Sequence, residues 1–119
     1  METRIRQILQ GMKAGLPIGI GYFPIAVAFG ALAMEAGLRV GDAALMSVLV
    51  FAGASQFMAA GMMIAGAGGL QIVLATFFVN LRHFMMSMAV HHRLENVGEG
   101  MRALVSFGIT DETFAYLTL

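Results

Sequence analysis

The stretch AALMSVLVFAGASQFMAAGMMIAGAGGLQIVLATFFVNL, residues 43–81, contains 39 residues and no charged side chain. An α-helix rises about 1.5 Å per residue, so one straight helix of this length would be twice as long as the hydrocarbon core of a bilayer. The chain must therefore turn inside the stretch. The sequence GAGG at residues 66–69 is the turn signal, because glycine clusters mark turns. This pattern predicts two membrane segments, 43–65 and 70–90.

Two further apolar segments flank this stretch. Residues 14–34 form an uncharged run of 21 residues between Lys13 and Glu35, which is long enough to cross the membrane once as a helix. Residues 103–119 begin another apolar segment. The sequence therefore predicts an all-α, polytopic integral membrane protein with a membrane domain over residues 14–119.

Residues 1–13 differ from the rest because they are amphipathic. The apolar side chains recur at the i, i+3, i+4, i+7 spacing of one helix face, and basic side chains occupy the other face. The apolar members are Ile5, Ile8, Leu9 and Met12, and the basic members are Arg4, Arg6 and Lys13. This pattern predicts an interfacial helix on an anionic membrane surface. The alternative is a polar start of the first span.

The composition excludes several classes of protein. Apolar residues make up 59% of the chain and charged residues 12%, against about 45–50% and 25% in ordinary globular domains. Such a chain has too little polar surface for a soluble enzyme-like domain. Its seven basic and seven acidic residues cancel, so the chain lacks the net positive charge that is typical of nucleic-acid-binding proteins. The absence of cysteine excludes thiol chemistry. Three scattered histidines predict no metal site, so we expect neither an enzyme nor a cofactor.

The positions of the basic residues predict how the chain is oriented. The N-terminal flank is the most basic, which places the N-terminus in the cytoplasm by the positive-inside rule. If segment 43–65 crosses the membrane, the two sides carry three basic residues each. If the segment instead enters the membrane and returns to the same side, with a break at residues 53–55, the cytoplasmic side carries five basic residues and the opposite side carries one. Because 23 residues suffice for a span, we predict the crossing.

Helix-breaking residues mark two candidate parts of a binding site. Pro17 and Pro24 each remove a backbone donor inside the first span, so this helix is expected to be broken. It is either a kinked, tightly packed span or a broken helix that lines a substrate path. In the second segment Ser55 and Gln56 follow Gly53. They either hydrogen-bond a neighbouring helix or bind a polar ligand beside the break.

Charged residues inside the apolar segments are the strongest local signal. Arg82, which follows Asn80 closely, lies inside segment 70–90. A central arginine costs about 2.5–3.5 kcal/mol to insert, so it should face the protein interior and have a partner. That partner is either a carboxylate of the next segment, Asp111 or Glu112, or the carboxylate of a substrate. The two acidic residues are also candidates to carry a coupled proton, unless they form only a solvated helix end.

Five stretches together resemble the AzlC family, the large subunits of bacterial branched-chain amino acid exporters. In order, they are KAGLPIG at 13–19, GYFP at 21–24, FAGASQF at 51–57, NLRH at 80–83 and TDETF at 110–114. The resemblance implies a multi-pass permease of the bacterial inner membrane that exports leucine, isoleucine and valine. It also implies a small AzlD-type membrane partner.

Because nothing in the sequence resembles a nucleotide site, we predict a secondary carrier driven by an ion gradient. Family members are about twice as long as this chain, so we expect it to be an N-terminal portion. The predicted substrate-binding residues are Arg82, Asn80, Ser55, Gln56, Gly53, Pro17 and Pro24, and the predicted proton-coupling residues are Asp111 and Glu112. The alternative is a non-transporting structural subunit or an inactive fragment of a transporter.

Overall fold

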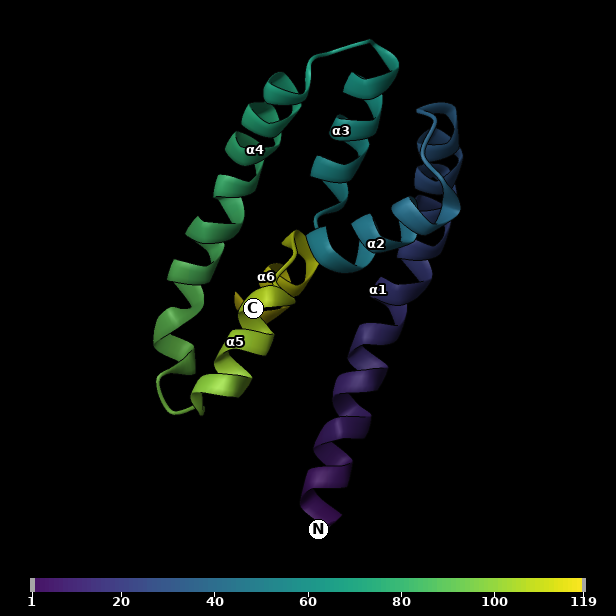
Figure 1. Cartoon of the computed structure of the whole chain (residues 1–119). Coiled ribbons are helices and arrows are strands. Elements are labelled where there is room, and N and C mark those ends of the chain that lie inside the picture. Colours follow the sequence, from purple (N-terminus) through teal and green to yellow (C-terminus); the bar gives the residue numbers. More distant parts are fainter. Residues whose placement is uncertain (1, 119) are drawn as a thin grey trace.

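The computed structural model describes residues 2–118, and these residues form helices and no strand (Figure 1). The elements are α1 (Glu2–Glu35), α2 (Val40–Val50), α3 (Gly53–Ile64), α4 (Gly69–Val90), the short 3₁₀ helix η1 (His91–Leu94), α5 (Glu99–Phe107) and α6 (Asp111–Thr118). The all-α fold class predicted from the sequence is confirmed.

Two helices of the described part are long and apolar enough to cross a membrane. They cover Thr3–Glu35 and Gly69–Leu94, and they contain the predicted segments 14–34 and 70–90. Both helices expose large apolar side chains, among them Phe23 on α1 and Phe78 on α4. Apolar surface of this extent is covered by lipid or by protein rather than water.

Helix α1 differs from its predicted form because it is continuous. It has 34 residues, which corresponds to about 50 Å. The expected separate interfacial helix over residues 1–13 is part of it, as is the expected first span. Pro17 and Pro24 lie inside this helix, so of the two predicted alternatives the broken helix is wrong and the continuous span remains. Proline's fixed φ of about −65° is itself helical, and each ring removes only one hydrogen bond while the neighbouring turns continue.

Segment 43–65 also differs from the predicted crossing, because it contains two short helices. Helix α2 has 11 residues and α3 has 12, so each is only about 16–18 Å long. In Figure 1 the α1–α2 and α3–α4 connections lie toward the same end of the molecule, and the α2–α3 break lies between the ends. The chain therefore dips inward along α2 and returns along α3, which is the alternative path weighed from the charges.

The α2–α3 break is set by the backbone of one residue. Phe51 ends α2 with a φ of 47° and a ψ of 34°, in the left-handed region. A bulky side chain rarely adopts this conformation. The break therefore lies at residues 51–52, just before the predicted position at 53–55, which forms the first turn of α3.

The predicted fourth segment is likewise divided into two helices. Gly108 ends α5, and α6 starts at Asp111. Thr110 and Thr113 cap this start reciprocally: the Thr110 N–H donates to Thr113 Oγ1 (2.7 Å), and the Thr113 N–H donates to Thr110 Oγ1 (3.4 Å). Threonine hydroxyls at a helix start satisfy backbone donors that lack an intrahelical partner. The segment is therefore not one continuous span in the described residues.

The small core joins α1 to α3. Ala33 and Ala60 are fully buried, and Phe29 is nearly so. Small residues let two helices approach closely. The Phe29 ring packs edge-on against Phe57, with ring centroids 5.7 Å apart. This contact fixes the first turns of α3 beside the C-terminal third of α1.

Candidate functional site

The two helix breaks are joined by an aromatic contact. Phe51, at the end of α2, stacks on Phe107, at the end of α5, with ring centroids 5.6 Å apart and planes inclined by 25°. After each break a new helix begins, α3 on one side and α6 on the other. The start of a helix carries unpaired N–H groups and a partial positive charge. Both breaks therefore present polar backbone groups to the same region.

Two cavities lie at this meeting point. The larger one, which we call the apolar cavity, has a volume of about 400 Å³ and reaches from α1 to α3 and α6. Its walls include Ile18, Ile25, Phe29, Phe51 and Phe57. The smaller one, the polar cavity, has a volume of about 210 Å³ and is lined by the charged residues of α4 and α6.

The two cavities have wall residues in common, including Tyr22, Gly53 and Thr110. An apolar space therefore adjoins a charged one. Such a pair of spaces is complementary to a small amphipathic molecule with a charged head and an aliphatic tail.

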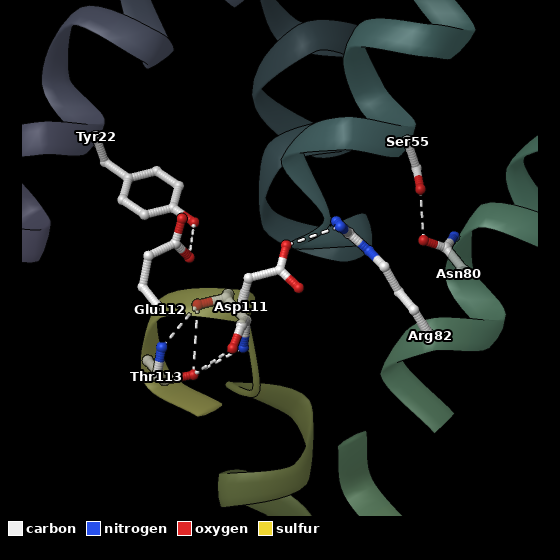
Figure 2. Close-up of polar contacts among 8 residues, drawn as sticks. Tyr22, Ser55, Asn80, Arg82, Asp111, Glu112 and Thr113 are labelled. Atoms are coloured by element: carbon white, nitrogen blue, oxygen red, sulfur yellow. Dashed lines mark hydrogen bonds and ion pairs between the residues drawn. The ribbon is translucent and has the colours of Figure 1, made fainter. Parts of the chain in front are cut away.

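The charged centre of the polar cavity is an ion pair. Arg82 Nη1 lies 2.7 Å from Asp111 Oδ2 (Figure 2). Of the two carboxylates predicted as partners, the structure pairs Asp111 with Arg82. The side chains are 39% and 54% exposed, and within the described residues the buried Arg82 Nε has no hydrogen-bond partner. The ion pair with Asp111 therefore does not use the Nε–H donor of Arg82.

Glu112 points to the other side, toward α1. The Tyr22 hydroxyl donates a hydrogen bond of 2.7 Å to Glu112 Oε2. Figure 2 shows that Asp111 and Glu112 leave the first turn of α6 in different directions, one toward α4 and one toward α1. This turn thus links both long helices across the polar cavity. Sequence reasoning missed Tyr22, although it lies in the GYFP motif.

Two other predicted residues contact each other instead of facing either cavity. The Ser55 hydroxyl donates to Asn80 Oδ1, which links α3 to α4. Ser55 is buried, and neither residue is among those that line the two cavities. Their geometry corresponds to the interhelical hydrogen bond that was the alternative to ligand binding.

Of the remaining predicted residues, two line a cavity and two do not. Gly53 lines both cavities, and Gln56 lines the apolar one while donating to Ser47 Oγ at 3.1 Å. Pro17 and Pro24 line neither, but the residues that follow them, Ile18 and Ile25, do.

His83 is a second residue that sequence reasoning did not assign to the site. It follows Arg82 on α4 and lines the polar cavity. The signal was present in the NLRH motif, which places an ionisable ring inside an apolar segment. Among residues 2–118 no group of three histidine or acidic residues is arranged to hold a metal ion.

Comparison with known proteins places the sequence of this chain in a family. The sequence model described as AzlC protein matches residues 17–119. The chain belongs to the AzlC family. The match covers both helix breaks, the ion pair and both cavities, so the candidate site lies within the family region.

Three relatives illustrate what this AzlC-family chain resembles. It is 34% identical over 111 residues to the inner membrane protein YgaZ of Escherichia coli, covering 92% of this chain and 45% of the relative. It is 37% identical over 106 residues to an uncharacterized membrane protein of Archaeoglobus fulgidus, covering 89% and 46%. It is 26% identical over 100 residues to the branched-chain amino acid transport protein AzlC of Bacillus subtilis, covering 84% and 39%.

The names of these relatives and the two long apolar helices agree on a membrane location. The chain spans about half the length of the curated relatives that it matches. No solved structure matches it.

Proposed function

We propose that the protein transports branched-chain amino acids across the bacterial inner membrane and exports them as a secondary carrier. One observation supports this most directly: the Arg82–Asp111 pair lines the polar cavity, and this cavity shares wall residues with the apolar cavity beside the two helix breaks. Interrupted helices at mid-membrane are where many transporters bind substrate. The printed name of the Bacillus subtilis relative supports the same substrate class.

In this proposal the substrate lies across both cavities. Its carboxylate binds the planar fork of Arg82, which offers two parallel donors. The first N–H groups of α3, at Gly53 and Ala54 on the wall of the polar cavity, supply further donors. The aliphatic side chain occupies the apolar cavity between Ile25, Phe29 and Phe57. A hydrophobic pocket discriminates one methylene by about 1–3 kcal/mol, so selectivity among leucine, isoleucine and valine is expected to be modest.

The arrangement of basic residues supports a cytoplasmic N-terminus. In Figure 1 the start of α1 and the α4–α5 connection lie toward the same end of the molecule. That end carries five basic residues, and the opposite connections carry only Arg39. The five are Arg4, Arg6, Lys13, Arg93 and Arg102. Because basic residues favour the cytoplasmic side, this end is proposed to face the cytoplasm.

The proposal also includes a small AzlD-type membrane partner and proton coupling through the acidic residues of the site. The apolar faces of α1 and α4 offer surface for such a partner beside lipid. Co-expression with the small subunit is therefore one arm of the test.

The test measures radiolabelled valine export from cells that make the whole protein as its gene encodes it, with and without the small subunit. Arg82→Lys keeps the charge but removes the fork. Because a hydrogen bond to a charged group contributes about 1.5–3 kcal/mol, we expect export to fall roughly 10- to 100-fold. The matched control is Arg39→Lys, since Arg39 bonds Asp42 through its backbone N–H.

Two results would contradict the proposal. Normal valine export by Arg82→Lys would remove Arg82 from substrate binding. If the whole protein exports no valine even with the small subunit, the alternative of a non-transporting structural subunit is correct.

A further inference from the structure

A third cavity lies at the corner where α4 ends and α5 begins. It has a volume of about 380 Å³, and its walls come from α4, η1 and α5. It has no wall residue in common with the apolar or the polar cavity. In Figure 1 this corner lies toward the same end of the molecule as the start of α1. The proposed transport site therefore does not account for this cavity, which we call the corner cavity.

The polar part of the corner cavity consists of groups that can donate hydrogen bonds to an anion. Arg102 and Ser106 come from α5, Ser87 comes from α4, and His91 and His92 come from η1. Within the described residues no acidic side chain lines this cavity. Its wall therefore combines a fixed positive charge with hydroxyl and imidazole groups, and it is complementary to an anion.

The guanidinium of Arg102 is held in place by the chain beside it. Its Nη2 group donates to the carbonyl oxygens of Glu95 (3.2 Å) and Val97 (3.4 Å). The carboxylate of Glu95 is bonded instead to His92 Nδ1, at 2.7 Å. The Nη1 group of Arg102 makes no hydrogen bond within residues 2–118, and Nε is the buried guanidinium atom that lacks a partner. Arg102 thus offers an accessible donor, Nη1, on a head that is already ordered, which reduces the entropy lost when a ligand binds.

The apolar part of the corner cavity continues along α4. Phe84 and Met88 line the cavity and are 64% and 61% exposed. They are four residues apart, so they lie on one face of the helix, and the next turn of this face leads to His91 and His92. The distance along the helix from residue 84 to residue 91 is about 10 Å. Because α4 is long and apolar enough to cross a membrane, this face runs from the end of the span into the hydrocarbon region.

We propose that the corner cavity binds the phosphate group of an anionic phospholipid, with one acyl chain along Phe84 and Met88. The phosphate oxygens accept hydrogen bonds from Arg102 Nη1 and from the hydroxyls of Ser87 and Ser106. Arginine binds phosphate well because its N–H groups match the spacing of the phosphate oxygens. Basic pockets between membrane helices bind such headgroups in other proteins. The proposal does not depend on transport, since the cavity is separate from the candidate site.

A free phosphate ion has the same charged chemistry, but two features favour the lipid. The donors lie where the membrane-crossing helix α4 ends, which is the depth of the lipid headgroups. The exposed faces of Phe84 and Met88 provide an apolar surface next to these donors, and a free phosphate has no group to cover it. The experiment includes both ligands for this reason.

The experiment counts the lipids that the whole protein retains in native mass spectrometry. The protein, as its gene encodes it, is released from detergent micelles that contain equal amounts of phosphatidylglycerol and phosphatidylcholine. We expect one phosphatidylglycerol molecule to be bound about fivefold more tightly than phosphatidylcholine, whose choline group neutralises the phosphate. Inorganic phosphate in large excess is expected to leave this lipid bound.

The first variant removes the charge of the cavity. Arg102→Gln should weaken the binding of phosphatidylglycerol roughly 10- to 100-fold, the effect of losing a hydrogen bond to a charged group. The matched control is Arg93→Gln, at the same end of the molecule. Arg93 donates to the carbonyl oxygen of Leu117 and does not line the cavity, so its loss should weaken binding at most about fivefold.

The second variant fills the cavity and leaves every charge in place. Ser87→Leu should weaken the binding of phosphatidylglycerol about tenfold or more, because the larger side chain occupies the space of the headgroup. The matched control is Ala89→Leu, which adds the same side chain to an exposed position of α4 outside the cavity. This control should retain the lipid as the wild-type protein does. Since Arg102 also orders the η1–α5 connection, Ser87→Leu decides the question if Arg102→Gln does not fold.

Four results would overturn the proposal. Equal retention of the two lipids by the wild-type protein would show that the cavity does not select a charge. Equal losses in Arg93→Gln and Arg102→Gln would show a diffuse attraction to the basic end of the molecule. Wild-type retention by Ser87→Leu would place the lipid outside the cavity. Displacement of the lipid by inorganic phosphate would identify a free phosphate as the ligand.

Discussion

The ion pair between Arg82 and Asp111 makes a quantitative prediction about stability. The perturbation is a double-mutant cycle with Arg82→Gln, Asp111→Asn and the two changes combined. Each single change leaves one charge at the polar cavity without its partner, which lies 2.7 Å away in the structure. The double change removes both charges. We therefore expect the double variant to be more stable than the sum of the single effects predicts.

The exposed fractions set the size of this coupling. Pairs that are fully exposed contribute about 0.2–1 kcal/mol, and removing one partner of a fully buried pair costs about 3–5 kcal/mol. Arg82 and Asp111 are 39% and 54% exposed, so they lie between these limits and closer to the first. The expected coupling is about 1–2 kcal/mol.

The assay is reversible unfolding of the whole protein in mixed lipid–detergent micelles titrated with denaturing detergent. The control cycle is Arg39→Gln with Asp42→Asn, where the carboxylate accepts from a backbone N–H that survives the side-chain change. This control is expected to be additive. If the Arg82–Asp111 cycle were also additive within about 0.3–0.5 kcal/mol, the pair would contribute nothing and the reasoning from its geometry would fail.

Three further predictions follow from individual contacts. Phe51→Ala and Phe51→Gly both lose the stacking on Phe107, but only glycine adopts the left-handed backbone at this position without strain. Phe51→Gly should therefore be more stable than Phe51→Ala by about 1–2 kcal/mol in the same unfolding assay. Equal stabilities would mean that the backbone at residue 51 is unstrained. Ser55→Ala and Asn80→Ala should each destabilise the protein by about 0.6–1.7 kcal/mol and leave valine affinity unchanged, and a selective loss of affinity would instead place these side chains on the substrate. Phe29→Leu enlarges the apolar cavity, so competition assays should show a gain in the relative affinity for bulkier aromatic amino acids. Unchanged selectivity would mean that this cavity does not recognise the substrate.

The sequence was sufficient for features that depend on local pattern. The position of α4 and of residues 14–34 of α1 follows from the uncharged runs. The turn at residues 66–69 follows from glycine, since Gly66 has a φ of 75°. The pairing of Arg82 with a carboxylate of the last segment follows from the cost of an unpaired charge in lipid.

Other features depend on contacts between distant residues and could not be read from local pattern. The path of segment 43–65 is set at Phe51, whose ring stacks on Phe107. Ser55 has a side chain that could bind a ligand, but in the structure its hydroxyl donates a hydrogen bond to Asn80. His83 is drawn into the site only because α6 starts opposite α4. In each case the contacting partner is many residues away in the sequence, so the spacing of residues along the chain does not predict the contact.

The two half-length helices constrain the order in which the protein enters its membrane. Helices α2 and α3 have 11 and 12 residues, and a segment of this length is too short to be inserted by itself as a span. The bend at Phe51–Ala52 would expose unpaired backbone groups to lipid, at a cost of several kcal/mol. We therefore expect α1 and α4 to be integrated first during synthesis, and the α2–α3 hairpin to insert between them afterwards. This expected late step depends on a segment made after the hairpin itself.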